Sequence, residues 1–134
     1  MKNRVLAVCL VTAVLLVISR PVFAHHSAAG LFSRKDQRSI SGTVRKWLFV
    51  NPHAALVMDI KNAAGDVETW RIQFLSPPQL GRMFGWNRKS IKPGDQITIL
   101  GNPYVDGKKV MFPLRVTFAN GKVYTVREPE KDPE

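Results

Sequence analysis

The segment "SPPQLGRMFGW" at residues 76–86 decides the fold, because here the spacing of apolar residues changes from that of a strand to that of a helix. Ser76 is a suitable helix N-cap, and Pro77 fits the first helical position, where no backbone N–H is needed. Apolar residues then recur at three- and four-residue intervals, and these are Leu80, Met83 and Phe84. The segment predicts a helix of about two turns.

The rest of the chain consists of strand-like runs in which apolar and polar residues alternate. Three runs precede the helix, two follow it, and a short sixth run comes last. The predicted strands are residues 39–50, 54–61, 67–75, 96–105, 108–119 and 122–128. Three strands, a helix and two strands is the chain order of an OB-fold barrel.

Two glycines support a small closed barrel. Gly42 in the first run and Gly101 in the fourth permit the sharp coiling that such a barrel requires. We therefore predict an all-β domain with one short helix, a small OB-fold-like antiparallel β-barrel of order β-β-β-α-β-β. An open antiparallel sheet or a sandwich with the same number of strands is the alternative.

Alternation also predicts which residues face the core. In the first strand the inward set is Ile40, Gly42, Val44, Leu48 and Val50. Lys46 interrupts this set, which indicates a bulge or a strand end. In the fifth strand the inward set is Val110, Phe112, Leu114, Val116 and Phe118.

Residues 1–24 have the pattern of a cleaved signal peptide. Lys2 and Arg4 precede an apolar run at residues 5–18, and Ala24 ends the expected cleavage site. At about 1.5 Å per residue the run spans roughly 21 Å, less than the roughly 30 Å core of a bilayer. We expect a periplasmic or secreted protein with no stable membrane anchor. The expected organisation is a leader at 1–24, a lead-in at 25–38, a barrel domain at 39–127 and a charged tail at 128–134.

The chain of 134 residues carries a formal net charge of +10. Removal of Lys2, Arg4 and Arg20 with the leader lowers this charge to +7, and Cys9, the only cysteine, leaves as well. The processed chain therefore has no disulfide, thiolate ligand or cysteine nucleophile. The positive surplus favours an anionic partner, or it serves only solubility. Nucleic acid is not expected as the partner of an exported protein.

Two histidines follow the expected cleavage site. Cleavage after Ala24 makes His25 the first residue, so that its free α-amino group and its imidazole can chelate one metal ion. His53 is the expected further nitrogen ligand, with His26 as a substitute or an extra one. Such nitrogen sets suit Cu(II), so copper is the expected cofactor. The alternative is that these histidines are only polar residues of a terminus and a turn.

A second candidate site is a basic and aromatic face. Trp47 and Phe49 fall on the parity opposite to the first strand's apolar face, with Arg45 beside them and Arg71 on the third strand. Such a face suits an anionic glycan or an envelope protein as partner. The alternative is that the two aromatic side chains belong to the core. No catalytic motif accompanies either site, so we expect a binding protein and not an enzyme.

Several pieces of the chain resemble a family of small exported bacterial proteins called domain of unknown function 6152. They are "AHHSAAGLF", "GTVRKWLFVNPHAALVMDI", Trp70, "LGRMFGWNRKSIKPGDQITILGNPYVDGK" and "LRVTFANGKVY", and they cover nearly all of residues 24–124. The resemblance implies an exported small β domain and brings no activity or ligand. Its recognisable polar features are His25, His26, Asn51, Pro52 and His53. The family often has an acidic residue directly after the aromatic residue of the lead-in, where this chain has Arg34, Lys35 and then Asp36. If a carboxylate belongs to the site, Asp36 is the nearest candidate.

Overall fold

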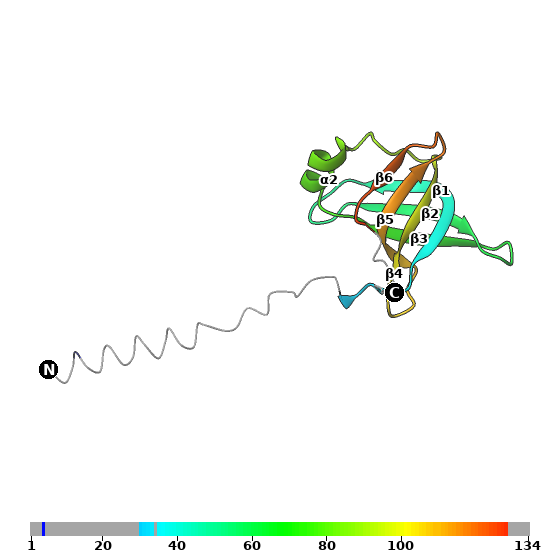
Figure 1. Ribbon diagram of the computed structural model, residues 1–134, viewed down its shortest axis with the longest axis horizontal. Helices are drawn as coiled ribbons and strands as arrows, with labels where there is room; N and C mark the ends of the chain where they lie inside the picture. Colours follow the sequence, from blue (N-terminus) through cyan, green and yellow to red (C-terminus); the bar gives the residue numbers. More distant parts are fainter. Residues whose placement is uncertain (1–3, 5–29, 34, 129–134) are drawn as a thin grey trace.

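The structure is a computed structural model that describes residue 4, residues 30–33 and residues 35–128. Among the described residues from 30 to 128, six strands and one helix follow each other in the predicted order (Figure 1). They are β1 (Arg38–Leu48), β2 (Ala55–Lys61), β3 (Val67–Gln73), α2 (Pro77–Phe84), β4 (Gln96–Pro103), β5 (Val110–Phe118) and β6 (Val123–Thr125).

The strands form one sheet of order β3-β2-β1-β4-β5-β6, and an additional pairing of β3 with β5 closes a barrel. The predicted OB-fold-like barrel is therefore confirmed. One detail of the prediction is wrong: the closing pair, Arg71 with Val110 and Ile72 with Met111, is parallel, whereas all other pairs are antiparallel. The reason is topological, because α2 and β4 carry the chain back before β5 begins, so that β5 runs in the same direction as β3.

Helix α2 begins and ends where the sequence indicates. Ser76 is extended, and its backbone N–H donates to the Gln79 side chain at 3.2 Å, as in a capping box. Gly85 follows the helix with a positive φ of 70°, which a residue with a Cβ adopts at a cost. Leu80 is fully buried, so the helix packs through this side chain. Figure 1 shows α2 at one end of the barrel.

A β-bulge in β1 changes which side chains face the core. Val44 pairs with Met58 on β2, as alternation predicts. The next pair is Lys46 with Val57, so Arg45 is an extra residue in the strand. An extra residue reverses the alternation beyond it, because side-chain direction has a period of two.

The reversal makes part of the first-strand prediction wrong. Trp47 pairs with Leu56 and faces the core, whereas the sequence analysis placed Leu48 and Val50 there. Val50 is 51% exposed. The residues before the bulge follow the prediction, since Val44 is buried and Ile40 packs against the core.

A second irregularity makes part of the fifth-strand prediction wrong. Leu100 pairs with Arg115, but the next pair is Gly101 with Pro113, so Leu114 is an extra residue in β5. Before this point the buried residues are Met111 and Pro113, and not the predicted Val110 and Phe112. After it, Leu114 and Val116 are buried as expected.

The glycines of β1 and β4 lie where chains approach closely. A Cβ on Gly42 would meet the backbone oxygen of Asp59 on β2. A Cβ on Gly101 would lie 2.5 Å from the Phe112 backbone oxygen on β5. Inside the barrel, the core is apolar, with no buried polar or charged residue in the described part of the chain.

The expected lead-in segment contacts the barrel through residues 31–33. Ser33 donates a backbone hydrogen bond to Pro103, and Val105 donates one to Leu31, each at 2.9 Å. Phe32 is buried against Tyr104, with ring centroids 5.1 Å apart. The expected leader at residues 1–24, apart from Arg4, and both His25 and His26 lie outside the described residues. No helix within the described ranges is long and apolar enough to cross a membrane.

Candidate ligand-binding face

The outer surface of β2 and β3, with the loops β1–β2 and β4–β5 beside it, is the surface on which OB-fold barrels commonly hold ligands. In this chain the two strands pair over their full length, from Ala55 with Gln73 to Lys61 with Val67. Loop β4–β5 adjoins β3, because Arg71 donates a backbone hydrogen bond to Lys109 at 2.9 Å. Strands β1, β2 and β3 lie side by side in Figure 1.

Lys46, Val57 and Arg71 form one row across β1, β2 and β3. They point outward because their chain neighbours Leu56 and Ile72 are buried inside the barrel. Strands are spaced by about 4.8 Å, so the backbones of Lys46 and Arg71 lie roughly 10 Å apart. Neither cation has an ion pair or side-chain hydrogen bond within the described part of the chain. The row therefore carries two uncompensated positive charges on either side of Val57.

Arg45, the extra residue of the bulge, is held by a partner. Its Nε lies 3.4 Å from Oδ2 of Asp59, and the arginine side chain is 62% exposed. The other carboxylate oxygen of Asp59 accepts a hydrogen bond from the Thr69 hydroxyl at 3.0 Å. Asp59 thus compensates Arg45 and leaves Lys46 and Arg71, with Lys61 at the end of β2, as the cations of the face.

The lysines of loop β4–β5 also have carboxylate partners. Nζ of Lys109 lies 3.1 Å from Oε1 of Glu68, and this hydrogen bond, ahead of those from Asn62 and Trp70, lowers the pKa of Glu68 below its ordinary value of 4.5. Lys108 hydrogen-bonds Asp106 at 2.6 Å, which lowers the pKa of Asp106 and raises that of Lys108. The loop contributes shape and local polarity more than net charge.

Trp47 and Phe49, the two aromatic candidates for this face, point towards the core. Trp47 packs edge-to-face on Phe74 and Trp86, with centroids 5.5 and 5.9 Å apart, and Phe49 lies 5.6 Å from Trp47. Both are half-buried against the core. The structure thus does not bring Arg45, Trp47, Phe49 and Arg71 together on one surface: the arginines lie outside, and the aromatic rings help to close the barrel.

Lys46 is the residue that the sequence analysis missed as a candidate. It was noted only as a break in an apolar face. That break in the apolar pattern indicated the bulge. The bulge turns Trp47 inward and, for the same reason, places Lys46 in the outer row.

His53 lies exposed on loop β1–β2, with no hydrogen bond or ion pair to the rest of the described chain. The other predicted ligands, His25 and His26, are outside the described residues. Asp36 is paired with Arg38 at 2.9 Å. Among the described side chains no group of three or more His, Cys, Asp and Glu is arranged to hold a metal ion.

Comparison with known families identifies the chain. The family described as "Family of unknown function (DUF6152)" matches residues 13–112. The chain belongs to this family. Membership confirms the resemblance seen in the sequence and assigns no activity. None of the curated proteins compared with the chain matches it in sequence.

Among solved structures, the DUF6152 chain is similar to mitochondrial single-stranded DNA binding proteins from S. cerevisiae. One crystal form of Rim1 is 11% identical, covers 66% of this chain and 94% of its own, and has a TM-score of 0.47. Another form is 13% identical, with coverages of 75% and 99% and a TM-score of 0.43. At this level the likeness concerns the fold alone.

One expectation about partners is corrected by this comparison. The expectation that nucleic acid is no partner does not stand beside these solved structures, which are those of single-stranded DNA binding proteins.

Proposed function

We propose that this DUF6152 chain is an OB-type binding module that holds an anionic glycan across the outer face of β2 and β3. The observation that carries the proposal is the row of Lys46, Val57 and Arg71, in which two cations that have no partner among the described residues flank an apolar side chain. Carboxylate or sulfate groups on successive sugars can bridge two cations at a spacing of roughly 10 Å.

The rest of the face favours a glycan as the anionic ligand. Single-stranded nucleic acids are held largely by stacking of bases on exposed aromatic rings. The outward residues of β2 and β3 are Val57, Asp59, Lys61, Val67, Thr69, Arg71 and Gln73, and none is aromatic. Their hydroxyl, carboxylate and amide groups suit the hydroxyls of a sugar chain.

The test is binding of polygalacturonate, dextran and single-stranded oligothymidylate to the chain without residues 1–24. We expect polygalacturonate to bind, with an affinity that falls as salt rises, and dextran not to bind. The double variant Lys46→Ala/Arg71→Ala should weaken polygalacturonate binding by about tenfold or more. Arg82→Ala/Arg115→Ala removes the same charge from exposed positions on α2 and β5 and serves as the matched control.

Two results would contradict the proposal. Equal weakening by both double variants would mean that net charge, and not this row, attracts the polymer. Oligothymidylate binding that exceeds polygalacturonate binding and depends on Lys46 and Arg71 would assign the face to nucleic acid.

We also propose a copper site at the processed amino terminus, formed by the amine and imidazole of His25 with His53, and with His26 assisting. The supporting observation is that His53 is exposed and has no described partner. Leu31 is hydrogen-bonded to Val105 on loop β4–β5. From Leu31 the chain can reach back to His25 over roughly 20 Å at most.

Copper binding and export are tested together. We expect the exported protein to be recovered from the periplasm or medium and to begin at His25 by mass spectrometry. Its one-to-one Cu(II) affinity should fall about tenfold or more on addition of one glycine before His25, or in His53→Ala. A different mature start, or equal affinity in all three proteins, would contradict the site.

A further inference from the structure

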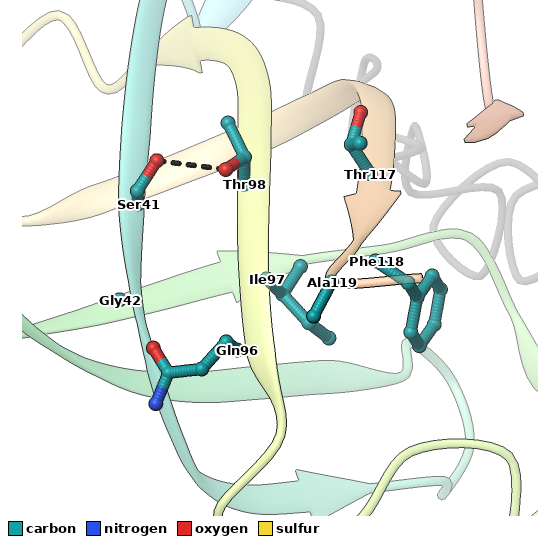
Figure 2. Close-up of a pocket in the computed structure, with 8 residues that line it drawn as sticks. All are labelled: Ser41, Gly42, Gln96, Ile97, Thr98, Thr117, Phe118 and Ala119. Carbon is teal, nitrogen blue, oxygen red and sulfur yellow. Dashed lines mark hydrogen bonds between the residues drawn. The ribbon is translucent and has the colours of Figure 1, made fainter. Parts of the chain in front are cut away.

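A polar groove lies over β4 and shares no residue with the Lys46–Arg71 row. Here Ser41, Thr98 and Thr117 are cross-strand neighbours on β1, β4 and β5. They form a row of three hydroxyl groups on adjacent strands, beside a pocket of about 120 Å³ that Gln96 and Phe118 also line. Figure 2 shows the hydroxyls of Ser41 and Thr98 facing each other across β1 and β4.

The groups in this part of the groove have unused hydrogen-bonding capacity. The Ser41 and Thr98 hydroxyl oxygens are 2.7 Å apart, so that one hydroxyl donates a hydrogen bond to the other. Because each hydroxyl carries its own proton, one O–H of the pair remains able to donate to a ligand. Gln96 donates its amide N–H to Thr43 at 2.7 Å, which leaves its carbonyl oxygen as an acceptor. This part of the groove therefore offers one hydroxyl donor and one carbonyl acceptor to a ligand.

The groove continues into a wider and basic part of about 390 Å³, which shares Gln96, Phe118 and Ala119 with the first. This volume is within the roughly 300–1,000 Å³ usual for small-molecule sites. Lys89 and Lys92 line it, are exposed, and have no ion pair in the described part of the chain. Asp95 lies there as well, so that the local charge is one positive unit in excess.

The basic part is built on a loop that its own side chains hold in place. Lys89 donates its backbone N–H to the Asn87 side chain, and Lys92 donates its backbone N–H to Asp95, each at 2.8 Å. The backbone N–H of Asn87 in turn donates to the Ser90 hydroxyl at 2.8 Å. The two ammonium groups thus project from a fixed backbone, which reduces the entropy cost of binding an anion.

We propose that this groove is a second binding site and that its ligand is an acidic sugar. The row of Ser41, Thr98 and Thr117 with the Gln96 carbonyl binds the sugar hydroxyls. Lys89 and Lys92 bind the acidic group. The site lies on a different face from the proposed glycan-binding row and shares no residue with it.

The experiment uses galacturonic acid, galactose and acetate as probes of the chain without residues 1–24. We expect galacturonic acid to bind most tightly and to shift the amide resonances of residues 41–43, 89–98 and 117–120. Lys89→Ala/Lys92→Ala should weaken galacturonic acid binding by about tenfold and leave galactose binding unchanged. Thr98→Val, which keeps the shape and removes the hydroxyl, should weaken both sugars but not acetate.

Further outcomes of the same experiment decide the proposal. Equal affinity for acetate and galacturonic acid, or shifts confined to other residues, would overturn it. Retention of the galacturonic acid affinity in Lys46→Ala/Arg71→Ala would support it, because that variant disables the other face alone. Loss of affinity in that variant with shifts only on β2 and β3 would show that the groove is not the site.

Discussion

The indole N–H of Trp47 donates a hydrogen bond to the backbone carbonyl of Asn87, 3.0 Å away. The bond joins the end of β1 to the loop that follows α2, and it fixes the ring against the core. Trp47→Phe keeps an aromatic ring and removes the donor. We expect a loss of about 0.5–1.5 kcal/mol in the free energy of unfolding, measured by urea denaturation.

The same variant separates a structural role of Trp47 from a binding role. Because the ring faces the core, polygalacturonate affinity should stay within about twofold of wild type. A variant of unchanged stability that no longer bound the polymer would show that the indole contacts ligand.

Gly42→Ala tests the close approach of β1 to β2. The new Cβ would meet the Asp59 backbone oxygen and the Ile60 side chain, and backbone cannot yield as a flexible side chain does. We expect a destabilisation of about 1–3 kcal/mol in urea denaturation. Gly30→Ala is the matched control, since a Cβ there has nothing within 4 Å and Gly30 does not have a positive φ. Equal free energies of unfolding for the two variants would contradict the close approach of Gly42 to β2.

Gly81→Ala tests whether the low helix propensity of Gly81 reduces the stability of helix α2. A Cβ at Gly81 would lie 3.6 Å from the Trp86 backbone oxygen, an ordinary van der Waals distance. Alanine has the higher helix propensity, so thermal unfolding should show a stabilisation of about 0.5–1 kcal/mol. Gly85→Ala, at a φ of 70°, should destabilise. A loss of stability in Gly81→Ala would indicate tighter packing of α2.

Glu68 makes the stability of the barrel depend on acid. The hydrogen bond from Lys109, ahead of those from Asn62 and Trp70, lowers the pKa of Glu68 in the folded chain below 4.5. The stabilisation that ionised Glu68 gives to the folded chain is therefore fully present above the unfolded pKa of about 4.5. It is lost as the pH falls through the lower pKa of the folded chain.

Glu68→Gln should accordingly flatten the fall in melting temperature between neutral pH and acid. Asp66→Asn removes another carboxylate of the same hairpin, which takes part in no ion pair of the described chain, and it serves as the control. An acid profile in Glu68→Gln that matches the wild type would show that this carboxylate does not couple to folding.

Local patterns in the sequence were sufficient for the order of elements and for much of the core. Alternation along β2 puts Leu56, Met58 and Ile60 on one face, and all three are buried. The residues around Ser76 and Pro77 gave the start of α2. These features depend on interactions within a few residues, such as capping and alternation, so neighbouring residues suffice to predict them.

The tertiary structure alone decided which side chains form the surfaces. Lys46 and Arg71 share a row only because the bulge at Arg45 resets the register of β1 on β2. Ser41, Thr98 and Thr117 meet only through pairing across three strands. Register between strands distant in the sequence is set by packing of the whole barrel, and one inserted residue reverses every later side chain. No local pattern of residues contains that information, so only the tertiary structure shows which side chains share a face.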